Sequence, residues 1–368
     1  MQKIAIIGNG SLNVDSRNNR FLINNHTGLL LQELIKAGND ILYIEPFAIY
    51  NSNADLVNFC LKKENIPFWG FNKSNKLNLF KSIFSLINKI RQTTFVYIFL
   101  PGSLGMLSAI IAICLRKKIG IYLRGDLGDI NLKTKWILKD AKFILSVSPL
   151  LNKLISSYNK NVQCIKPMIW VALNDLREKK ITTEPNKTWQ FLFVGNLSPT
   201  KGIYELIEVA NILNQNKISF HFTLVGAGVL YNELLEKYKN REIPQNITIA
   251  GLVNDKSELL NLYRCSDIFF FPTHTEGFAR TLFEAMSQSL PIFTTMVGGI
   301  SGYMTNYYNC FEIPLQQPIE QARIVMQHLE NVDALNKVAN NGYITIKNVL
   351  TDLTPHHQLI INYLNELN

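Results

Sequence analysis

The feature of this chain that most constrains its fold is an alternation of strand-like and helix-like segments that runs through the sequence twice. In the first half, the apolar runs "KIAIIGNG", "DILYIEP", "TFVYIFLPG", "KIGIYLRGD" and "AKFILSVSP" alternate with helical patterns such as Thr27–Asn39. The alternation restarts at "TWQFLFVGNLSPTKG" and continues through "FHFTLVGAG", "NITIAGLV" and "DIFFFP". Because continuous apolar strands separated by helices form parallel sheets with both faces covered, each half predicts such a sheet.

Two halves with this pattern predict an α/β protein of two Rossmann-like, doubly wound parallel-sheet domains that face a central cleft. The length of 368 residues suits two domains. We assign residues 1–170 to an N-terminal, acceptor-binding domain and 171–352 to a C-terminal domain, with the charged stretch Met168–Thr188 as the linker. Residues 353–368 are a candidate for a helix that crosses back to the N-terminal domain.

Composition excludes several classes of protein. Five scattered cysteines without a C-x-x-C pair argue against a disulfide framework and fit a reducing compartment. The longest apolar run, Leu104–Leu115, has about 12 residues, whereas a membrane-spanning helix needs roughly 20. Since "MQKIAIIGNG" leads straight into a strand without a signal-peptide pattern, we expect a cytoplasmic protein.

Charge is distributed unevenly between the two halves. Residues 1–180 hold 25 Lys and Arg against 11 Asp and Glu, whereas residues 181–368 hold 12 against 17. A basic half favours an anionic partner, or it is simply a solvated basic surface. Nucleic acid is not expected as that partner, because the chain lacks an aromatic-basic surface motif.

The segment Asn75–Gln92 is amphipathic. Its apolar positions are Leu79, Ile83, Leu86, Ile87 and Ile90, and its basic positions are Lys76, Lys81, Lys89 and Arg91. This pattern favours peripheral docking on an anionic membrane surface, on the cytoplasmic face of an inner membrane. An ordinary helix packed on the sheet explains the same pattern.

Three loops of the second half follow predicted strands. In "VGNLSPTKG" (Val194–Gly202), Lys201 lies beside the first turn of a helix, where it can face a phosphate or simply be a surface lysine. The turn "VGAG" (Val225–Gly228) is a weak signal by itself. In "PTHTEGFARTLFEAMSQ", a loop precedes the helix 280–288, and the backbone N–H groups at the start of that helix form a natural anion site.

The third loop carries two glutamates, Glu276 and Glu284, eight residues apart. On an ideal helix this spacing is about 12 Å, too far for two carboxyl groups to share a proton. The two side chains can grip different parts of one extended ligand. Alternatively, Glu276 caps the helix and Glu284 faces solvent.

The stretch "EGFARTLFEA" resembles the E-x7-E motif of retaining glycosyltransferases with the GT-B fold, in particular family 4. The resemblance extends through "FVGNLSPTKGIYELIEVA", "LVGAG" and "GLVNDKSELLNLYRCSDIFFFPTHTEGFARTLFEAMSQSLPIFTTMVGG". The first half resembles the family only in its layout.

The resemblance implies roles for individual residues. Glu276 would face the donor sugar, Lys201 would neutralise the diphosphate, and Glu284 would bind the ribose hydroxyls. The other implied donor-binding residues are Gly8, Gly10, Gly195, Asn196, Gly226, Val253, Gly277, Phe278, Ala279, Arg280 and Thr281.

Four positions depart from the family pattern. Asn196 stands where the family usually has Arg, Arg124 where it has His, Ala279 where Gly or Pro is frequent, and Ser289 where Gly is usual. We hypothesise that Arg124 is a catalytic residue that supplies the charge lost at Asn196.

The resulting prediction is a retaining glycosyltransferase that uses a nucleotide-diphosphate sugar, with UDP-sugar favoured. Its acceptor would be a saccharide or a lipid-linked saccharide in bacterial surface polysaccharide synthesis, such as lipopolysaccharide or capsule. No metal or other cofactor is expected, because the chain lacks a D-x-D triplet and a His/Cys cluster with metal spacing. The alternatives are a nucleotide-sugar epimerase of the same fold and a non-catalytic subunit of a glycan-assembly complex. A dehydrogenase fits poorly, since "GNGSLN" lacks the third glycine of the dinucleotide fingerprint.

Overall fold

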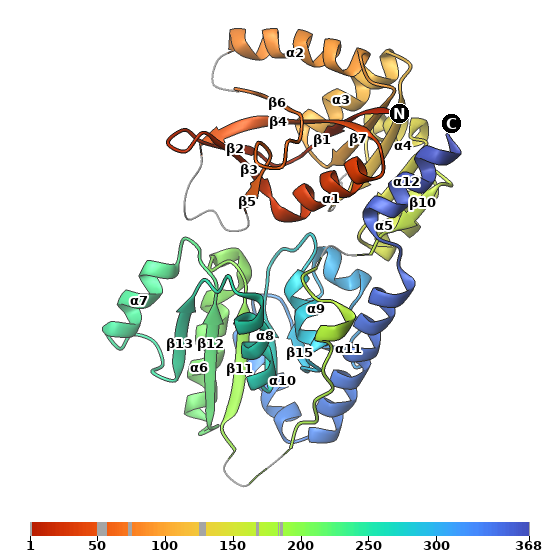
Figure 1. Ribbon diagram of the computed structural model, residues 1–368. Coiled ribbons are helices and arrows are strands. Elements are labelled where there is room, and N and C mark those ends of the chain that lie inside the picture. Colours follow the sequence, from red (N-terminus) through yellow and green to blue (C-terminus); the bar gives the residue numbers. More distant parts are fainter. Residues whose placement is uncertain are drawn as a thin grey trace. The chain divides into compact units, whose positions relative to one another are not determined.

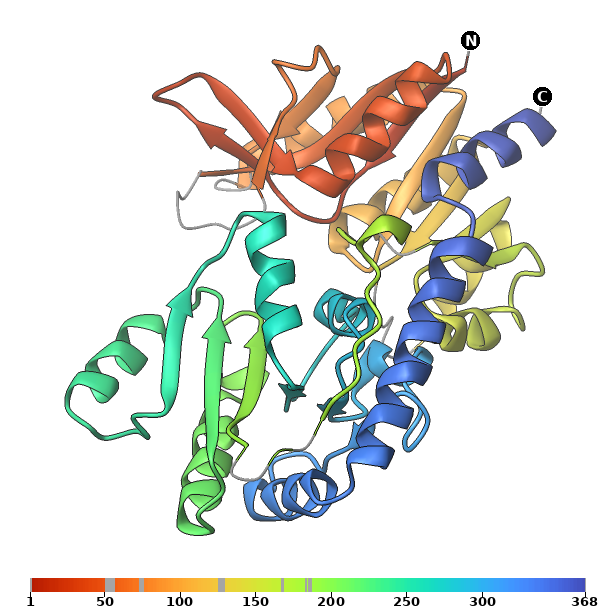
Figure 2. The same ribbon diagram turned by 60° about the horizontal axis from the view of Figure 1, so that its bottom comes forward.

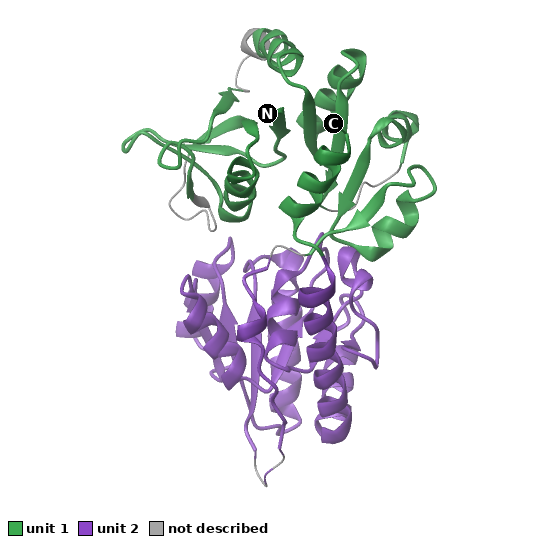
Figure 3. Cartoon of the chain, turned by 45° about the vertical axis from the view of Figure 1, so that its right-hand side comes forward, with its two compact units in different colours: residues 1–168, 354–368 green, residues 169–353 purple. Residues whose placement is uncertain are grey.

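The computed structural model divides the chain into two compact units (Figure 3). Unit 1 comprises residues 1–168 and 354–368, and unit 2 comprises residues 169–353. The residues that the structure describes are 2–49, 57–72, 76–124, 130–166, 169–182, 184 and 187–367, with the side chains of 57, 58 and 76–80 left out. Among them, no helix is both long enough and apolar enough to cross a bilayer.

Unit 1 is built on a ten-stranded, mainly parallel sheet (Figure 1). Its main path runs β10-β9-β8-β7-β1-β4-β2-β3-β5, and β6 pairs with β4. The strands are β1 (Lys3–Ile7), β2 (Leu12–Asp15), β3 (Arg20–Asn24), β4 (Asp40–Ile49), β5 (Val57–Cys60), β6 (Phe68–Phe71), β7 (Phe95–Leu100), β8 (Lys118–Leu123), β9 (Phe143–Ser146) and β10 (Val162–Cys164). The antiparallel pairs β2–β3 and β3–β5 were not predicted from the alternation.

The central strands of unit 1 present two chemically different faces to the helices. On one face, Tyr97 and Phe143 contact α12 (His356–Glu366), with the Phe143 and Tyr363 rings stacked 4.3 Å apart. Helix α1 (Asn25–Lys36) contacts α12 and lies along the strands (Figure 2). The opposite face is aliphatic and packs against α2 (Lys76–Arg91), α3 (Ser103–Cys114), α4 (Leu132–Asp140) and α5 (Pro149–Ile155).

Helix α2 covers most of the amphipathic segment for which membrane docking was predicted. Leu86 and Ile90 are buried in the core, while Phe84 is exposed. The side chains of Lys76 and Leu79 lie outside the described residues. Leu86 and Ile90 therefore pack in the core of unit 1, as in an ordinary covering helix, while Ile83 and Ile87 are half-buried.

Unit 2 contains a six-stranded sheet in which every pair is parallel, in the order β13-β12-β11-β14-β15-β16. The strands are β11 (Trp189–Val194), β12 (Phe220–Val225), β13 (Ile247–Gly251), β14 (Ile268–Phe271), β15 (Ile292–Thr294) and β16 (Phe311–Glu312). The helices are α6 (Ile203–Gln215), α7 (Tyr231–Lys239), α8 (Lys256–Cys265), α9 (Arg280–Ser287), α10 (Pro318–Leu329) and α11 (Val332–Asp352). The prediction of parallel α/β sheets is thus confirmed.

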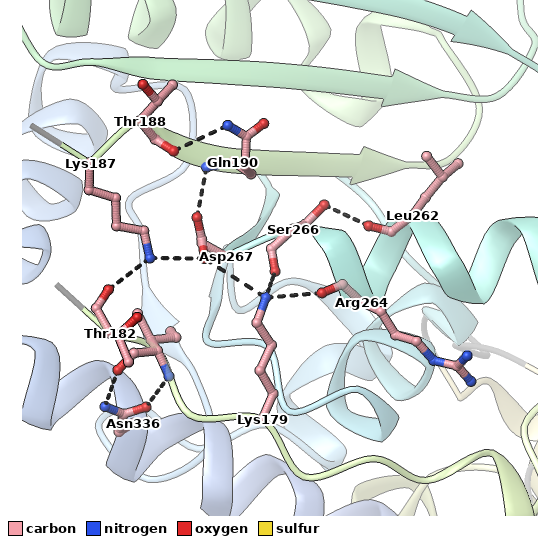
Figure 4. A network of polar contacts seen from close by, with 11 residues as sticks. Lys179, Thr182, Lys187, Thr188, Gln190, Leu262, Arg264, Ser266, Asp267 and Asn336 are labelled. Atoms are coloured by element: carbon pink, nitrogen blue, oxygen red, sulfur yellow. Dashed lines mark hydrogen bonds and ion pairs between the residues drawn. The ribbon is translucent and has the colours of Figure 1, made fainter. Parts of the chain in front are cut away.

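The described part of the predicted linker is tied to the amino-terminal edge of the sheet of unit 2 (Figure 4). Asp267, at the start of β14, accepts a hydrogen bond from Lys187 at 3.0 Å and lies 3.8 Å from Lys179. Lys179 also donates to the backbone oxygens of Arg264 and Ser266. Burial lowers the pKa of Lys179, and the Asp267 carboxylate opposes this shift. Lys179 and Lys187 are therefore anchored to unit 2 by a largely buried polar network.

Candidate active site

Two loops of unit 2 bring a cation and a carboxylate together. Strands β11 and β14 are parallel neighbours, so the loops that follow them lie at the same edge of the sheet. The Lys201 ammonium donates to the Glu276 carboxylate at 2.5 Å and to the Thr275 carbonyl at 2.9 Å. The side chains of Lys201 and Glu276 are only 19% and 16% exposed. The structure thus joins the two residues for which catalytic roles were predicted in this unit.

Gly202 allows this approach of the two loops. Lys201 ends a short 3₁₀ turn (Pro199–Lys201), and Gly202 follows with a left-handed φ of 71°. A Cβ atom at Gly202 would lie 2.1 Å from the Pro272 carbonyl oxygen, a distance that no side chain tolerates. The His274 N–H also donates to the Thr200 carbonyl at 2.9 Å. A glycine is required here because the two backbones touch.

The predicted donor-binding residues Gly195 and Gly226 lie next to each other. Gly226 has a φ of 141°, and a Cβ atom there would lie 1.9 Å from the Gly195 carbonyl oxygen. The Gly195 N–H donates to the Val225 carbonyl at 3.0 Å. Asn196 is exposed and lies beside Gly228, whereas Val253 packs half-buried against the core. Close packing against the Gly195 carbonyl therefore explains Gly226, whether or not it also contacts a ligand.

The backbone of Glu276 and Gly277 rests on a pair of glycines that the sequence analysis missed. A Cβ atom on Gly298 would lie 2.0 Å from the Glu276 carbonyl oxygen, and one on Gly299 would lie 2.1 Å from that of Gly277. The Gly299 N–H donates to the Glu276 carbonyl at 2.9 Å. The signal in the sequence was "VGG" (residues 297–299), shortly after the end of β15. These contacts fix the position from which the Glu276 side chain extends.

Helix α9 begins at Arg280 without a capping side chain, since Ala279 precedes it. The Thr281 hydroxyl is buried and has no hydrogen-bond partner among the described residues. The Phe278 ring stacks on Phe283 at 5.1 Å and holds the loop against the helix. The helix start thus offers backbone donors and one unsatisfied hydroxyl to a ligand.

Glu284 is a buried residue of α9, with 8% of its surface exposed. The Tyr263 hydroxyl donates to its carboxylate at 2.9 Å from α8. Burial raises the pKa of Glu284, while the Tyr263 hydrogen bond and the charge of Arg280 lower it by smaller amounts. The alternative in which Glu284 faces solvent is therefore wrong. Tyr263, whose own pKa is raised well above its usual value by burial and by Glu284, was not identified from sequence.

Unit 1 places Gly8 and Gly10 around a buried carboxylate. Glu45, on β4, is 3% exposed and accepts a hydrogen bond from the Gly10 N–H at 2.6 Å. A Cβ atom on Gly8 would lie 2.4 Å from the same Glu45 oxygen and 2.5 Å from the Tyr43 hydroxyl. The Gly8 N–H donates to the Ile44 carbonyl at 3.0 Å. The two glycines therefore accommodate Glu45, which sequence reasoning had treated as an ordinary strand residue.

Arg124 also lies in unit 1, at the end of β8. One of its guanidinium nitrogens donates to the Asn9 side chain at 3.3 Å, and its backbone N–H donates to the Leu100 carbonyl. The catalytic role of Arg124 stays a prediction. Within the described ranges, no group of three or more His, Cys, Asp or Glu side chains is arranged to hold a metal ion.

Comparison with known proteins finds a family match within unit 2. Residues 174–345 match the family model described as "Glycosyl transferases group 1", and solved glycosyltransferase structures align with the whole chain. Residues 174–345, nearly half of the chain, therefore form a domain of this family. The match covers all the loops of unit 2 described above, including Lys201, Glu276 and Glu284.

Individual relatives of this chain are distant in sequence. An Escherichia coli protein named UDP-Gal:alpha-D-GlcNAc-diphosphoundecaprenol alpha-1,3-galactosyltransferase is 29% identical over 144 residues, 38% of this chain and 36% of the relative. CapJ of Staphylococcus aureus is 24% identical over 87% of this chain and 84% of its own length. The chain spans 52%, 36% and 34% of the length of the first three curated relatives, about half or less, and the Escherichia coli protein is the second of them.

Solved structures resemble the whole chain rather than one unit. HepE of Anabaena, crystallised with UDP, aligns over 100% of both chains with a TM-score of 0.68 and 16% sequence identity. At this identity the likeness establishes the fold alone. The predicted arrangement of two parallel α/β sheets is confirmed by this alignment.

Proposed function

We propose that this glycosyltransferase moves a sugar from a nucleotide-diphosphate donor to a saccharide or lipid-linked saccharide, with retention of anomeric configuration. The observation that carries the proposal is the contact between Lys201 and Glu276 at the edge of the sheet where α9 begins. A UDP-sugar is favoured as the donor, because the E. coli relative is named for UDP-Gal and HepE was crystallised with UDP.

The chemistry requires that negative charge be stabilised on the leaving diphosphate while the sugar becomes oxocarbenium-like. A lysine and a helix N-terminus supply fixed positive potential where that charge develops, and such preorganised groups are the main source of electrostatic catalysis. Lys201 forms an ion pair with Glu276. When the donor binds, we expect its diphosphate to replace the Glu276 carboxylate as the anionic partner of Lys201. The buried Glu284 is suited to accept hydrogen bonds from ribose hydroxyls.

The acceptor and the biological setting are inferred from the names of relatives. One relative acts on a diphosphoundecaprenol-linked sugar, another is a capsular polysaccharide glycosyltransferase, and a structural neighbour is a lipopolysaccharide outer core galactosyltransferase. These names support bacterial surface polysaccharide synthesis, with peripheral attachment of the protein to the membrane that carries the acceptor.

The decisive experiment is a binding panel followed by product analysis. Isothermal titration of the purified full chain with UDP-, GDP- and ADP-sugars should detect binding of one nucleotide class. NMR of the product formed with that donor should show a retained anomeric configuration, and EDTA should leave the rate unchanged. Conversion of the donor to an isomer without an acceptor would favour the epimerase, and absence of all nucleotide binding would favour the non-catalytic subunit.

A further inference from the structure

Helices α4 and α5 of unit 1 lie near each other (Figure 1), and each carries exposed apolar side chains. Leu132 and Trp136 lie four residues apart on α4, and Leu150 and Leu154 lie four apart on α5, so each pair occupies one side of its helix. These four side chains, which we call the α4–α5 patch, are between 44% and 84% exposed. The opposite sides of both helices are buried in the core of unit 1.

The two helices are fixed to each other by polar contacts. The Asn159 side chain, just after α5, donates to the carbonyls of Leu138 and Ala141 at the end of α4, at 2.8 and 2.7 Å. The Lys135 ammonium of α4 lies 5.9 Å from the centre of the Tyr158 ring. The patch therefore belongs to a well-anchored surface rather than to a loose loop.

The surroundings of the patch are strongly basic. Residues 131–161 hold six lysines and a single acidic residue, Asp140. Lys133 and Lys139 are exposed on α4 and Lys153 is exposed on α5. Lysine is depleted in protein–protein interfaces, whereas apolar side chains flanked by lysine and tryptophan are typical of surfaces that bind anionic lipid headgroups. Charge complementarity therefore favours an anionic bilayer over a second protein.

We propose that the α4–α5 patch docks this protein on an anionic lipid bilayer, with the four apolar side chains among the headgroups and the lysines facing anionic phosphates. The inference rests on the proposed function only in that a lipid-linked acceptor would be met at the same membrane. It moves the docking surface away from α2, whose described apolar stripe packs on the sheet.

The test measures vesicle binding of the full chain without donor or acceptor, so it is independent of the transfer reaction. Vesicles of phosphatidylcholine alone are compared with vesicles that also contain phosphatidylglycerol. The variants are Leu132→Ser with Trp136→Ser, Leu150→Ser with Leu154→Ser, and Lys133→Glu with Lys139→Glu. The matched controls are Ile319→Ser, an exposed apolar residue of α10, and Phe84→Ser on α2. Thermal unfolding confirms that each variant is folded.

We expect binding only to the anionic vesicles, weakened by salt and at least tenfold weaker in each patch variant, with Ile319→Ser and Phe84→Ser unchanged. Absence of vesicle binding, or equal binding by the patch variants, would overturn the proposal. So would binding that is lost in Phe84→Ser alone, which would return the docking surface to α2. A concentration-dependent dimer that the patch variants abolish, without vesicle binding, would assign the patch to a second copy of the chain.

Discussion

In both units a central strand leads into a glycine-containing turn, but the charged side chain near that turn is acidic in unit 1 and basic in unit 2. In each unit a central strand runs into a glycine-containing turn: Gly8 and Gly10 after β1, and Gly195 after β11. In unit 1 the charged group at the turn is the buried Glu45 carboxylate, which accepts the Gly10 N–H. In unit 2 the loop continues to the Lys201 ammonium. A glycine turn after a strand therefore does not by itself mark a phosphate site, because the side chain that reaches it sets the charge.

From this contrast we expect anions to bind to unit 2 rather than to the glycine turn of unit 1. An internal carboxylate already occupies the Gly10 N–H, where a phosphate oxygen would bind in a dinucleotide fold, and it repels a further anion. We therefore expect donor phosphates to depend on Lys201 far more than on Gly8 or Gly10.

The largest effect is expected from the unit 2 pair. Lys201→Ala and Glu276→Ala should each lower kcat by about 10²–10³, the usual cost of removing a preorganised transition-state contact. Glu284→Ala should mainly weaken nucleotide binding. Steady-state kinetics and titration with the nucleoside diphosphate measure both effects. The control is Lys237→Ala, which removes a partly exposed ion pair with Glu233 on α7. Near-normal kinetics in all three variants would remove this site from the reaction.

Gly298→Ala tests whether the backbone beneath Glu276 is as important as the side chain. The new Cβ would collide with the Glu276 carbonyl, and a displacement of about 1 Å at a reacting group can cost roughly 10²-fold in rate. Gly38→Ala is the matched control, because Gly38 also has a positive φ but nothing within 4 Å of its Cβ position. The control should lose about 1 kcal/mol of stability and no activity. Equal activity losses in the two variants would contradict the supporting role of Gly298.

Arg124→Ala tests whether unit 1 contributes any positive charge to the donor. If Arg124 replaces the charge missing at Asn196, the variant should bind the donor more weakly and turn over more slowly, with a smaller loss than Lys201→Ala. Because Arg124 also donates to Asn9, Asn9→Ala serves as the control for a local structural effect. Unchanged affinity and turnover in Arg124→Ala would confine the donor charge contacts to unit 2.

Glu45→Ala should affect stability more than catalysis. Removing the carboxylate takes the protein acceptor from the Gly10 N–H, at a cost of about 0.5–1.5 kcal/mol, whereas Glu45→Gln retains an acceptor oxygen. Denaturant unfolding and kcat are compared for the two variants. If Glu45→Gln lowered kcat as much as Lys201→Ala while stability stayed constant, the contrast between the two turns would fail.

The pH dependence of stability is expected to differ between the two units, because a buried histidine lies in unit 1. Burial lowers the pKa of His356 to about 3, below its unfolded value of about 6.5, so the unfolded state takes up a proton first as the pH falls. Unit 1 should lose stability from about pH 6.5 downward, by about 2 kcal/mol at pH 5. Thermal unfolding between pH 7 and pH 5 measures this loss. His356→Gln should flatten the dependence and His221→Gln in unit 2 should not; the same slope in wild type and His356→Gln would refute the assignment.

The sequence predicted the elements whose signal is local. Parallel strands, the helix at Arg280 and the loop that carries Lys201 followed from apolar runs, glycines and a proline within a few residues of each other. The hairpin of β2 and β3 was missed because its residues, "LNVDSRNNRFLIN", are largely polar and do not alternate cleanly.

Features that depend on long-range register were not predictable in the same way. Glu45 sits within an apolar strand, and its burial follows from the pairing of β4 with β1, which brings Gly8 against its carboxylate. Tyr263 reaches Glu284 only because α8 packs on α9. The apolar stripe of α2 fits a sheet or a membrane equally well, since periodicity shows that a helix has an apolar side but not what covers it.

The composition of unit 1 from two separated stretches of chain has a consequence for the order of folding during synthesis. The Tyr97 hydroxyl shares a hydrogen bond with His356, and the Lys118 ammonium donates to the Leu367 carbonyl, so the aromatic face of unit 1 is completed by residues that are made after unit 2. At about 5–20 residues per second, translation of unit 2 delays that completion by roughly 10–40 s. During this interval a nascent chain exposes Tyr97, Tyr122 and Phe143, which makes the first half a natural client for chaperones until the final helix arrives.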